Sequence, residues 1–302
     1  MHTPTDQSIL VTGGAGFIGS HLAETLVADN DVVVLDNLSS GRREWVDNRA
    51  TLIEADIQDT QAVARAADGV DLIFHQAANV SVERSVDAPI ESHETNVDAT
   101  LRLLEHARKE DARFIYASSA AIYGTPESVP IDESDPKEPT SPYGLEKYSA
   151  DEYCRLYHEL YGVETVTLRY FNVYGPRQRG GQYSGVIDIF LDQARRGEEI
   201  TVHGDGEQTR DFVHVEDVVA ANCLAATHGT SGEAYNIGTS NSISVDTLAQ
   251  LIVDTFKTSS SITYIDPREG DIQQSCSSIK KAHQDLGFNP NWSLDDGLKT
   301  LW

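Results

Sequence analysis

The chain has 302 residues, 39% of them hydrophobic and 24% charged, so it can form one large domain or two smaller ones with a sizeable core. Its 48 acidic residues outnumber 23 basic ones, and the resulting net charge of −25 repels nucleic-acid phosphates and anionic lipid surfaces. We therefore expect no nucleic-acid or membrane partner. Repulsion between the acidic residues destabilises the folded chain at low ionic strength, and salt screens this repulsion. The charge therefore predicts a protein of a halophilic, high-salt cytoplasm, with an ordinary acidic enzyme as the alternative.

The apolar runs, the first residues and the cysteines agree with a cytoplasmic location. No run approaches the ~20 apolar residues that a membrane span needs. The first residues lack the basic start and apolar core of a signal peptide. The three cysteines and ten histidines show neither disulfide nor metal-ligand spacing. We expect a reducing cytoplasm and no metal ion.

Strand-like apolar runs alternate with helical patterns through the first half of the chain. The expected strands are 8–12, 31–36, 51–55, 71–77, 113–118 and 164–171, and the expected helices are 17–28, 59–67, 89–109 and 143–161. This alternation predicts an α/β protein with a doubly wound parallel sheet of the Rossmann type. Beyond it we expect a glycine-rich loop at 174–185 and shorter elements. The expected division is a dinucleotide-binding domain over 1–172 and a mainly substrate-binding lobe over 173–302, some of whose segments return to the first domain.

The first expected strand leads directly into a glycine-rich turn. Gly14-x-Gly16-x-x-Gly19 fits the dinucleotide fingerprint, and it lies between a strand and a helix, as that motif requires. Glycines allow the backbone to approach a pyrophosphate, whose charge meets the helix N-terminus. The residues assigned to this part of the cofactor site are Gly13, Gly16, Phe17, Ile18 and Gly19.

The second expected strand ends at an acidic residue, Asp36. An acid at this place accepts hydrogen bonds from the adenosine ribose and would repel a 2′-phosphate, which favours NAD over NADP. Arg42 and Arg43 follow closely and leave some tolerance of NADP open. Asp56, after the third strand, is placed either to meet the adenine amino group or to form a solvated turn. The neighbouring residues assigned to the cofactor are Asn37 and Ile57.

The stretch SPYGLEK at 141–147 places Tyr143 and Lys147 four residues apart, on one face of the expected helix. A lysine ammonium beside a tyrosine, together with a positively charged nicotinamide, favours the phenolate of a group whose usual pKa is about 10. The preceding strand brings Ser118 and Ser119 to its carboxyl end, where a hydroxyl can hold the substrate oxygen that gives its proton to the tyrosine. We assign Ser119, Tyr143 and Lys147 as catalytic, with Ser118 as the competitor for Ser119.

Together with the glycine motif, these residues resemble the extended short-chain dehydrogenase/reductase family, and the resemblance covers essentially the whole chain. The segment HQAA at 75–78 resembles the part of the family that lines the cofactor, and 168–177, 204–218 and 267–272 resemble its nucleotide-sugar branch. The resemblance implies further cofactor contacts, from Ala77, Ala78, Asn96 and Phe171, besides those of Tyr143 and Lys147.

The same resemblance implies a UDP-sugar site. Arg210 and Arg268 would clamp the diphosphate, because a guanidinium matches phosphate oxygens, although either could instead be a surface salt-bridge residue. Asn172 would hold sugar or phosphate, and Val186 and Ile187 would pack against the base or form helix core. The other residues implied to contact substrate are Ser81, Ser119, Tyr143 and Ser275.

The residues after Ser119 separate the reactions known in this family. Its dehydratases and decarboxylases carry an acid–base pair or a glutamate there, whereas this chain has Ala120 and Ala121. The chain therefore resembles the UDP-glucose and UDP-N-acetylglucosamine 4-epimerases. A 4-keto-sugar reductase, a uronate epimerase and a non-catalytic dinucleotide-sensing protein remain as alternatives. Helices 89–109 and 145–161 correspond to those of the family's dimer interface, which implies a homodimer unless their apolar faces pack within the chain.

Overall fold

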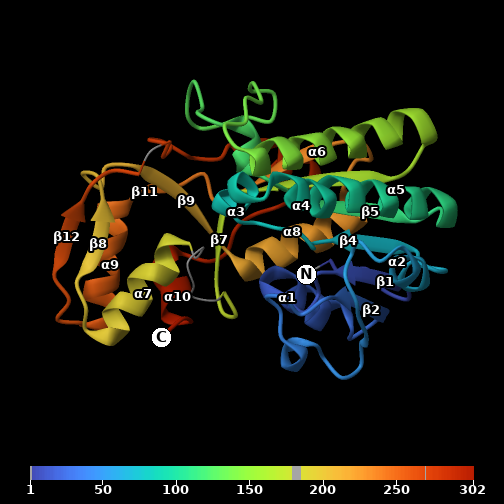
Figure 1. Ribbon diagram of the computed structural model, residues 1–302, viewed down its shortest axis with the longest axis horizontal. Helices are drawn as coiled ribbons and strands as arrows, with labels where there is room; N and C mark the ends of the chain where they lie inside the picture. The colour runs from blue at the N-terminus through green and yellow to red at the C-terminus, as the bar shows by residue number, and fades with distance from the viewer. Residues whose placement is uncertain (1, 179–184, 269) are drawn as a thin grey trace.

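The computed structural model describes residues 2–178, 185–268 and 270–302 of the chain (Figure 1). Its centre is a sheet in the order β10-β6-β5-β4-β1-β2-β3, in which all neighbouring strands run parallel. The strands are β1 (Ser8–Thr12), β2 (Asp31–Asp36), β3 (Thr51–Glu54), β4 (Leu72–His75), β5 (Arg113–Ser119), β6 (Thr165–Tyr170) and β10 (Ala234–Ile237). The strand order reverses between β1 and β4, which is where open α/β sheets bind ligands. The predicted doubly wound fold is confirmed.

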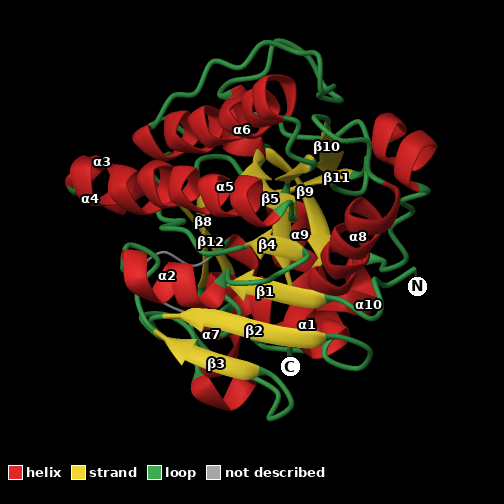
Figure 2. Ribbon diagram, turned by 90° about the vertical axis from the view of Figure 1, so that its right-hand side faces the viewer, coloured by secondary structure: helices red, strands yellow, loops and turns green. Residues whose placement is uncertain are grey.

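Helices cover both faces of this sheet (Figure 2). Those on one face are α1 (Phe17–Leu26) and α8 (Val215–His228), and those on the other are α2 (Thr60–Ala66), α5 (Ala99–Glu110) and α6 (Pro142–Tyr161). Successive residues of a strand point to opposite faces, so Ile9 and Val11 enter one core while Leu10 enters the other. A strand covered on both faces requires such a continuous apolar run, which explains why these strands could be predicted from the sequence.

Local signals set the ends of the main helices. The Asp59 carboxylate caps α2 by accepting hydrogen bonds from two backbone N–H groups of its first turn. The Ser141 hydroxyl caps α6 by accepting from the Gly144 N–H at 3.1 Å, and Pro142 occupies the first position of that helix. Gly162 ends α6 in the left-handed conformation, with φ of 74°.

The helix expected over 89–109 differs from the structure. It is divided into α4 (Pro89–His93), a π-helical turn η2 (Glu94–Asp98) and α5, and it is preceded by a short helix α3 (Val82–Asp87). Asn96 is buried within this π-helical turn, and its side-chain amide forms hydrogen bonds with Asn79 and Glu146, which are distant in the sequence. Those distant bonds have no signature in the local apolar pattern.

A second lobe follows β6. Its elements are β7 (Asn172–Tyr174), α7 (Val186–Arg196), β8 (Ile200–His203), β9 (Thr209–His214), β11 (Ser242–Ser244), α9 (Val245–Phe256), β12 (Ile262–Ile265) and α10 (Leu294–Lys299). They share a core of their own, whereas α8, β10 and the π-helical turn η4 (Ala282–Leu286) return to the seven-stranded sheet and its helices. Of the expected loop 174–185, residues 179–184 lie outside the described part of the chain. None of the helices in the described ranges could cross a membrane.

Candidate active site

The glycine turn after β1 is packed too closely to accept side chains. Gly13 has φ of 67°, and a Cβ atom built on it would lie 2.7 Å from the Ala77 backbone nitrogen. A Cβ atom on Gly19 would lie 2.2 Å from the Gly13 carbonyl oxygen. Gly16, Phe17 and Ile18 complete the turn and the start of α1. This leaves a backbone cradle at a helix N-terminus, which fits the pyrophosphate of a dinucleotide.

Asp36 lies at the end of β2, beside this turn. Its carboxylate accepts hydrogen bonds from the Ala15 N–H at 3.0 Å and from the Leu38 N–H at 2.8 Å. Beyond it, the Asn37 side-chain amide donates to the Asp56 carboxylate at 2.7 Å, so the loops after β2 and β3 are joined. Ile57 is buried in the core beneath these loops. The residues predicted to contact the adenosine thus lie in two joined loops, and Ile57 packs in the core beneath them.

The segment after β4 is fixed against the glycine turn by a buried histidine. The His75 ring is hydrogen-bonded to the hydroxyls of Thr12, at 2.7 Å, and Thr100, at 2.9 Å. Thr12 also accepts from the Ala77 N–H at 3.3 Å. Burial lowers the pKa of His75 to about 3, with a further contribution from Lys147, so the ring is neutral. Through Thr12 it fixes Ala77 beside the glycine turn, and Ala78 follows directly in the chain.

Asn96 joins this segment to α6. Its side chain accepts from the Asn79 N–H at 2.8 Å and donates to the Asn79 carbonyl at 3.0 Å. It also donates to the Glu146 carboxylate at 2.7 Å. Neither Asn79 nor Glu146 was among the predicted site residues, because their pairing depends on segments that are far apart in the chain.

Tyr143 and Lys147 lie on the buried side of α6, facing the end of β5. Burial raises the pKa of Tyr143, and a hydrogen bond with the Ser119 hydroxyl opposes that shift. The Lys147 ammonium donates to the Ala117 carbonyl at 2.8 Å and lies 5.0 Å from the centre of the Tyr116 ring. Burial lowers the pKa of Lys147 to about 8, against the opposing effect of the Glu146 carboxylate. The structure therefore brings together the serine, tyrosine and lysine that the sequence singled out.

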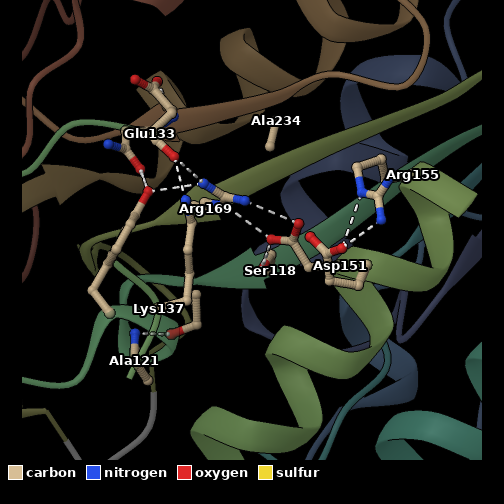
Figure 3. Close-up of polar contacts among 12 residues, drawn as sticks. Ser118, Ala121, Glu133, Lys137, Asp151, Arg155, Arg169 and Ala234 are labelled. Carbon is tan, nitrogen blue, oxygen red and sulfur yellow. Dashed lines mark hydrogen bonds and ion pairs between the residues drawn. The ribbon is translucent and has the colours of Figure 1, made fainter. Parts of the chain in front are cut away.

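Ser118 and Ser119 point to different surroundings. The Ser118 hydroxyl is buried and donates to the Asp151 carboxylate at 2.9 Å, within a polar cluster beneath the site (Figure 3). The Ser119 hydroxyl accepts from the Ala121 N–H at 3.2 Å and lies beside Tyr143. This arrangement favours Ser119 as the serine that meets substrate.

Parallel alanine variants test this choice. Ser119→Ala is expected to lower turnover roughly 10- to 1,000-fold, the scale of losing one donor to the reacting oxygen. Ser118→Ala is expected to lower the thermal midpoint, because the Asp151 carboxylate loses one hydrogen-bond donor, and to change the turnover number little. Steady-state kinetics and thermal unfolding of both variants measure the difference. A large loss of turnover confined to Ser118→Ala would reverse the assignment.

The expected substrate residues are more dispersed. Arg210, on β9, donates to the Ile272 carbonyl at 2.7 Å and pairs with Asp271, so part of its donor capacity is already used. Arg268 is exposed, and its carbonyl accepts a hydrogen bond from the Asp271 N–H. Ser275 is joined to β9 by a bond from its N–H to the Thr209 carbonyl. The Arg210–Asp271 pair has no local sequence signal, since the two residues lie in different elements.

Two predicted contact residues, Phe171 and Ile187, lie in hydrophobic cores. Phe171 packs with Ile122, Tyr123 and Ile131, and Ile187 is only 2% exposed in the core of the second lobe. The Ile187 side chain thus has the core position that was its alternative, whereas Val186, at the start of α7, is half-buried. The Ser81 hydroxyl caps α3 by accepting from the Arg84 N–H at 3.0 Å. Asn172 begins β7 and is half-buried.

Comparisons with known proteins agree with this geometry. Residues 9–238 match the family described as NAD dependent epimerase/dehydratase family. The chain is 37% identical to a UDP-glucose 4-epimerase of Mycolicibacterium smegmatis, over 96% of this chain and 95% of that protein. Relatives also include a decarboxylase acting on a UDP-sugar uronate and a dTDP-glucose 4,6-dehydratase with NAD bound.

Two solved structures share the whole fold. The UDP-glucose 4-epimerase of Thermotoga maritima, solved with UDP-glucose, is 41% identical, with a TM-score of 0.94 and coverage of 97% of this chain and 96% of that one. The UDP-N-acetylglucosamine 4-epimerase of Methanobrevibacter ruminantium, solved with UDP-N-acetylmuramic acid, is 35% identical, with a TM-score of 0.93 and coverage of 98% and 97%. The predicted resemblance and the NAD cofactor are confirmed, and the chain belongs to the NAD-dependent epimerase/dehydratase family.

Proposed function

We propose that this protein is a nucleotide-sugar 4-epimerase that interconverts UDP-N-acetylglucosamine with UDP-N-acetylgalactosamine, and UDP-glucose with UDP-galactose, through a transient 4-keto sugar. The observation that carries the proposal is the pairing of Ser119 with Tyr143 while Ala120 and Ala121 follow directly. The alanines can neither give nor take a proton, so elimination lacks a catalyst at this position. Oxidation at C4 and return of the hydride to the other face of the sugar remain.

Each residue of the site has a defined task in this reaction. Ser119 donates a hydrogen bond to the sugar hydroxyl, and Tyr143, as phenolate, takes the proton of that hydroxyl as the C4 hydrogen leaves. Lys147 stabilises the phenolate by its positive charge, and the hydrogen bond with Ser119 opposes the effect of burial on the Tyr143 pKa. When bound, NAD supplies the hydride acceptor and donor. In the return step C4 regains a hydride on its other face and its oxygen regains the proton from Tyr143, so no net oxidation occurs.

The experiment that tests the proposal is incubation of the purified protein with a panel of UDP-, dTDP- and GDP-sugars, followed by chromatography of the products. We expect C4 epimers of the UDP-sugars without consumption of external cofactor. Stoichiometric consumption of NADH would instead identify a 4-keto-sugar reductase, and a C4 product confined to a uronate would identify a uronate epimerase. No conversion of any sugar would support a dinucleotide-sensing protein.

Ser275 supports the acceptance of N-acetylated sugars. It lies four residues after Asp271, at the position implied to face the sugar C2 substituent, and its N–H is hydrogen-bonded to the Thr209 carbonyl of β9. A serine leaves space for an acetamido group that a tyrosine ring would fill. Ser81, implied to lie near the substrate, supports the same preference.

Replacing Ser275 with tyrosine tests this gate. Ser275→Tyr is expected to lower kcat/KM for UDP-GlcNAc relative to that for UDP-glucose by roughly 10- to 200-fold, the scale of a steric mismatch in a pocket. Ser275→Ala is the matched control and should keep both activities, because alanine leaves the same space. A wild-type protein limited to UDP-glucose and UDP-galactose, or an unchanged ratio in the tyrosine variant, would refute the gate assignment.

The proposal includes a homodimer formed by the faces of α4 and α6. Ile90 on α4 and Leu145 and Leu160 on α6 are large apolar side chains that are more than half exposed in the single chain. Burying them against a second copy would remove apolar surface from water. Light scattering of the wild type and of Leu160→Glu is the test, and a monomeric wild type would contradict a dimer.

A further inference from the structure

A buried glutamate stands between the catalytic pair in the sequence and plays no part in the reaction described above. Glu146, on α6, is only 4% exposed. One of its oxygens, Oε2, accepts hydrogen bonds from the Ser92 hydroxyl and from the Asn96 amide, each at 2.7 Å. Both donors are neutral, so the charge of a buried carboxylate here must be balanced by a neighbouring cation.

The cation next to Glu146 in the chain is Lys147, which is itself only 4% exposed. The two groups influence one another electrostatically, since the Glu146 carboxylate raises the pKa of Lys147 against the larger effect of burial. The same carboxylate raises the pKa of Tyr143, after burial and the opposing bond from Ser119. The charge of Glu146 therefore influences the pKa of both members of the pair.

The other titratable groups around Glu146 cannot replace it. Tyr116, from β5, has its pKa raised well above the usual value, mainly by burial, and so stays neutral. His75, from β4, is neutral for the same reason. Asp151, one turn further along α6, is paired with Arg169. The charged residues of α3 and α4 that could compete lie at the surface, where Arg84 pairs with Glu91.

We propose that Glu146 is a positioning residue for Tyr143 and Lys147: its carboxylate keeps a buried ammonium at Lys147 and ties α6 to Asn96, and thereby to the segment that lines the cofactor. The role assigned to the pair rests on the proposed function, but the link from Glu146 to Lys147 does not. Asn96 is also hydrogen-bonded to the backbone N–H and carbonyl of Asn79. The Glu146 carboxylate is therefore linked through Asn96 to the loop after β4.

Removing the negative charge of Glu146 should shift the pKa values of its neighbours in a direction that can be predicted. An anion favours a protonated neighbour, so its loss lowers the pKa of Lys147 and of Tyr143 together. Both limbs of the pH–rate profile depend on the ionisation of these two groups, so both should move to lower pH. A merely structural defect would lower the rate without moving the limbs.

The test compares Glu146→Gln with the wild-type holoenzyme by NMR of lysine labelled at the ε-carbon. The Lys147 signal is assigned as the one that is missing in Lys147→Arg. Glutamine keeps an oxygen for Ser92 and Asn96 and removes only the charge. We expect the titration midpoint of Lys147 to fall by roughly half a pH unit to one unit, with a parallel shift of the pH–rate profile. An unchanged midpoint would overturn the proposal.

Two further variants complete the comparison. Glu152→Gln removes one charge from the partly exposed Glu152–Arg155 pair on the same helix and should leave the Lys147 midpoint unchanged. Glu146→Asp keeps the charge and should keep the midpoint near that of the wild type. If the glutamine variant does not fold, Glu146→Ala serves for the same measurement. The proposed function fails separately, if Tyr143→Phe retains turnover, and the NMR midpoint remains decisive for Glu146 in that case.

Discussion

Replacing Tyr143 with phenylalanine is expected to lower turnover of UDP-sugars by at least about 100-fold, the usual effect of losing a positioned acid–base group. The change removes one hydroxyl from a buried side chain that lies beside Ser119, and it leaves the ring in place. The fold and the NAD content should therefore be unchanged. Single-turnover and steady-state assays, with NAD quantified in the same preparations, measure the effect.

Lys147→Ala is the companion variant. It is expected to lower turnover and NAD content together, because the ammonium, which donates to the Ala117 carbonyl near the end of β5, is predicted to support the phenolate and also to bond the nicotinamide ribose. The contrast between the two variants separates acid–base chemistry from cofactor binding. Near wild-type turnover in Tyr143→Phe would show that the proton is taken by another group.

The largest effect on stability is expected from Asp151→Ala, which leaves Arg169 as a buried cation without its partner. Both side chains are about 5% exposed or less, and the Arg169 Nε and Nη2 atoms donate to the two Asp151 oxygens at 2.9 and 3.1 Å. Arg169 also donates to the Tyr123 hydroxyl and the Glu133 carbonyl, and Figure 3 shows its guanidinium between Glu133 and Asp151. Breaking such a pair costs roughly 3–5 kcal/mol of the free energy of unfolding.

The measurement is denaturant unfolding at a fixed NAD concentration, since bound cofactor adds to apparent stability. Glu152→Ala, which breaks the partly exposed pair with Arg155 on the same helix, is the matched control and should cost less than about 1 kcal/mol. Replacing Asp151 and Arg169 together by leucine and methionine should recover much of the loss, because no charge then remains buried. Equal effects of Asp151→Ala and Glu152→Ala would contradict this account.

Much of the nucleotide-binding half could be predicted because its signals are local. The strands of a sheet covered on both faces need continuous apolar runs, and each predicted strand of the first half lies within two residues of the observed one. The glycine turn depends on contacts between neighbouring residues, such as Gly13 with Gly19. Tyr143 and Lys147 lie on the same side of α6 because residues four apart share a helix face.

The remaining parts depended on contacts between distant segments. The pairing of Asn96 with Glu146 spans 50 residues and that of Arg210 with Asp271 spans 61, so no pattern within one element indicates either. The burial of Ile187, and of Phe171 beside Ile131, follows from how elements pack against one another.

The sequence by itself determined the class of fold, the cofactor and the catalytic tyrosine and lysine candidates, because glycine spacing, a strand-end acid and a helical repeat act over a few residues. The different surroundings of Ser118 and Ser119, which support the prediction of Ser119 as the serine that meets substrate, are visible only in the tertiary structure. Neighbouring residues of a strand face opposite sides, and the packing of α6 and β6 on β5 places Asp151 and Arg169 on the side of Ser118 and Tyr143 on the side of Ser119. The same packing buries Glu146 against Asn96, since only the folded chain brings α6 to the π-helical turn.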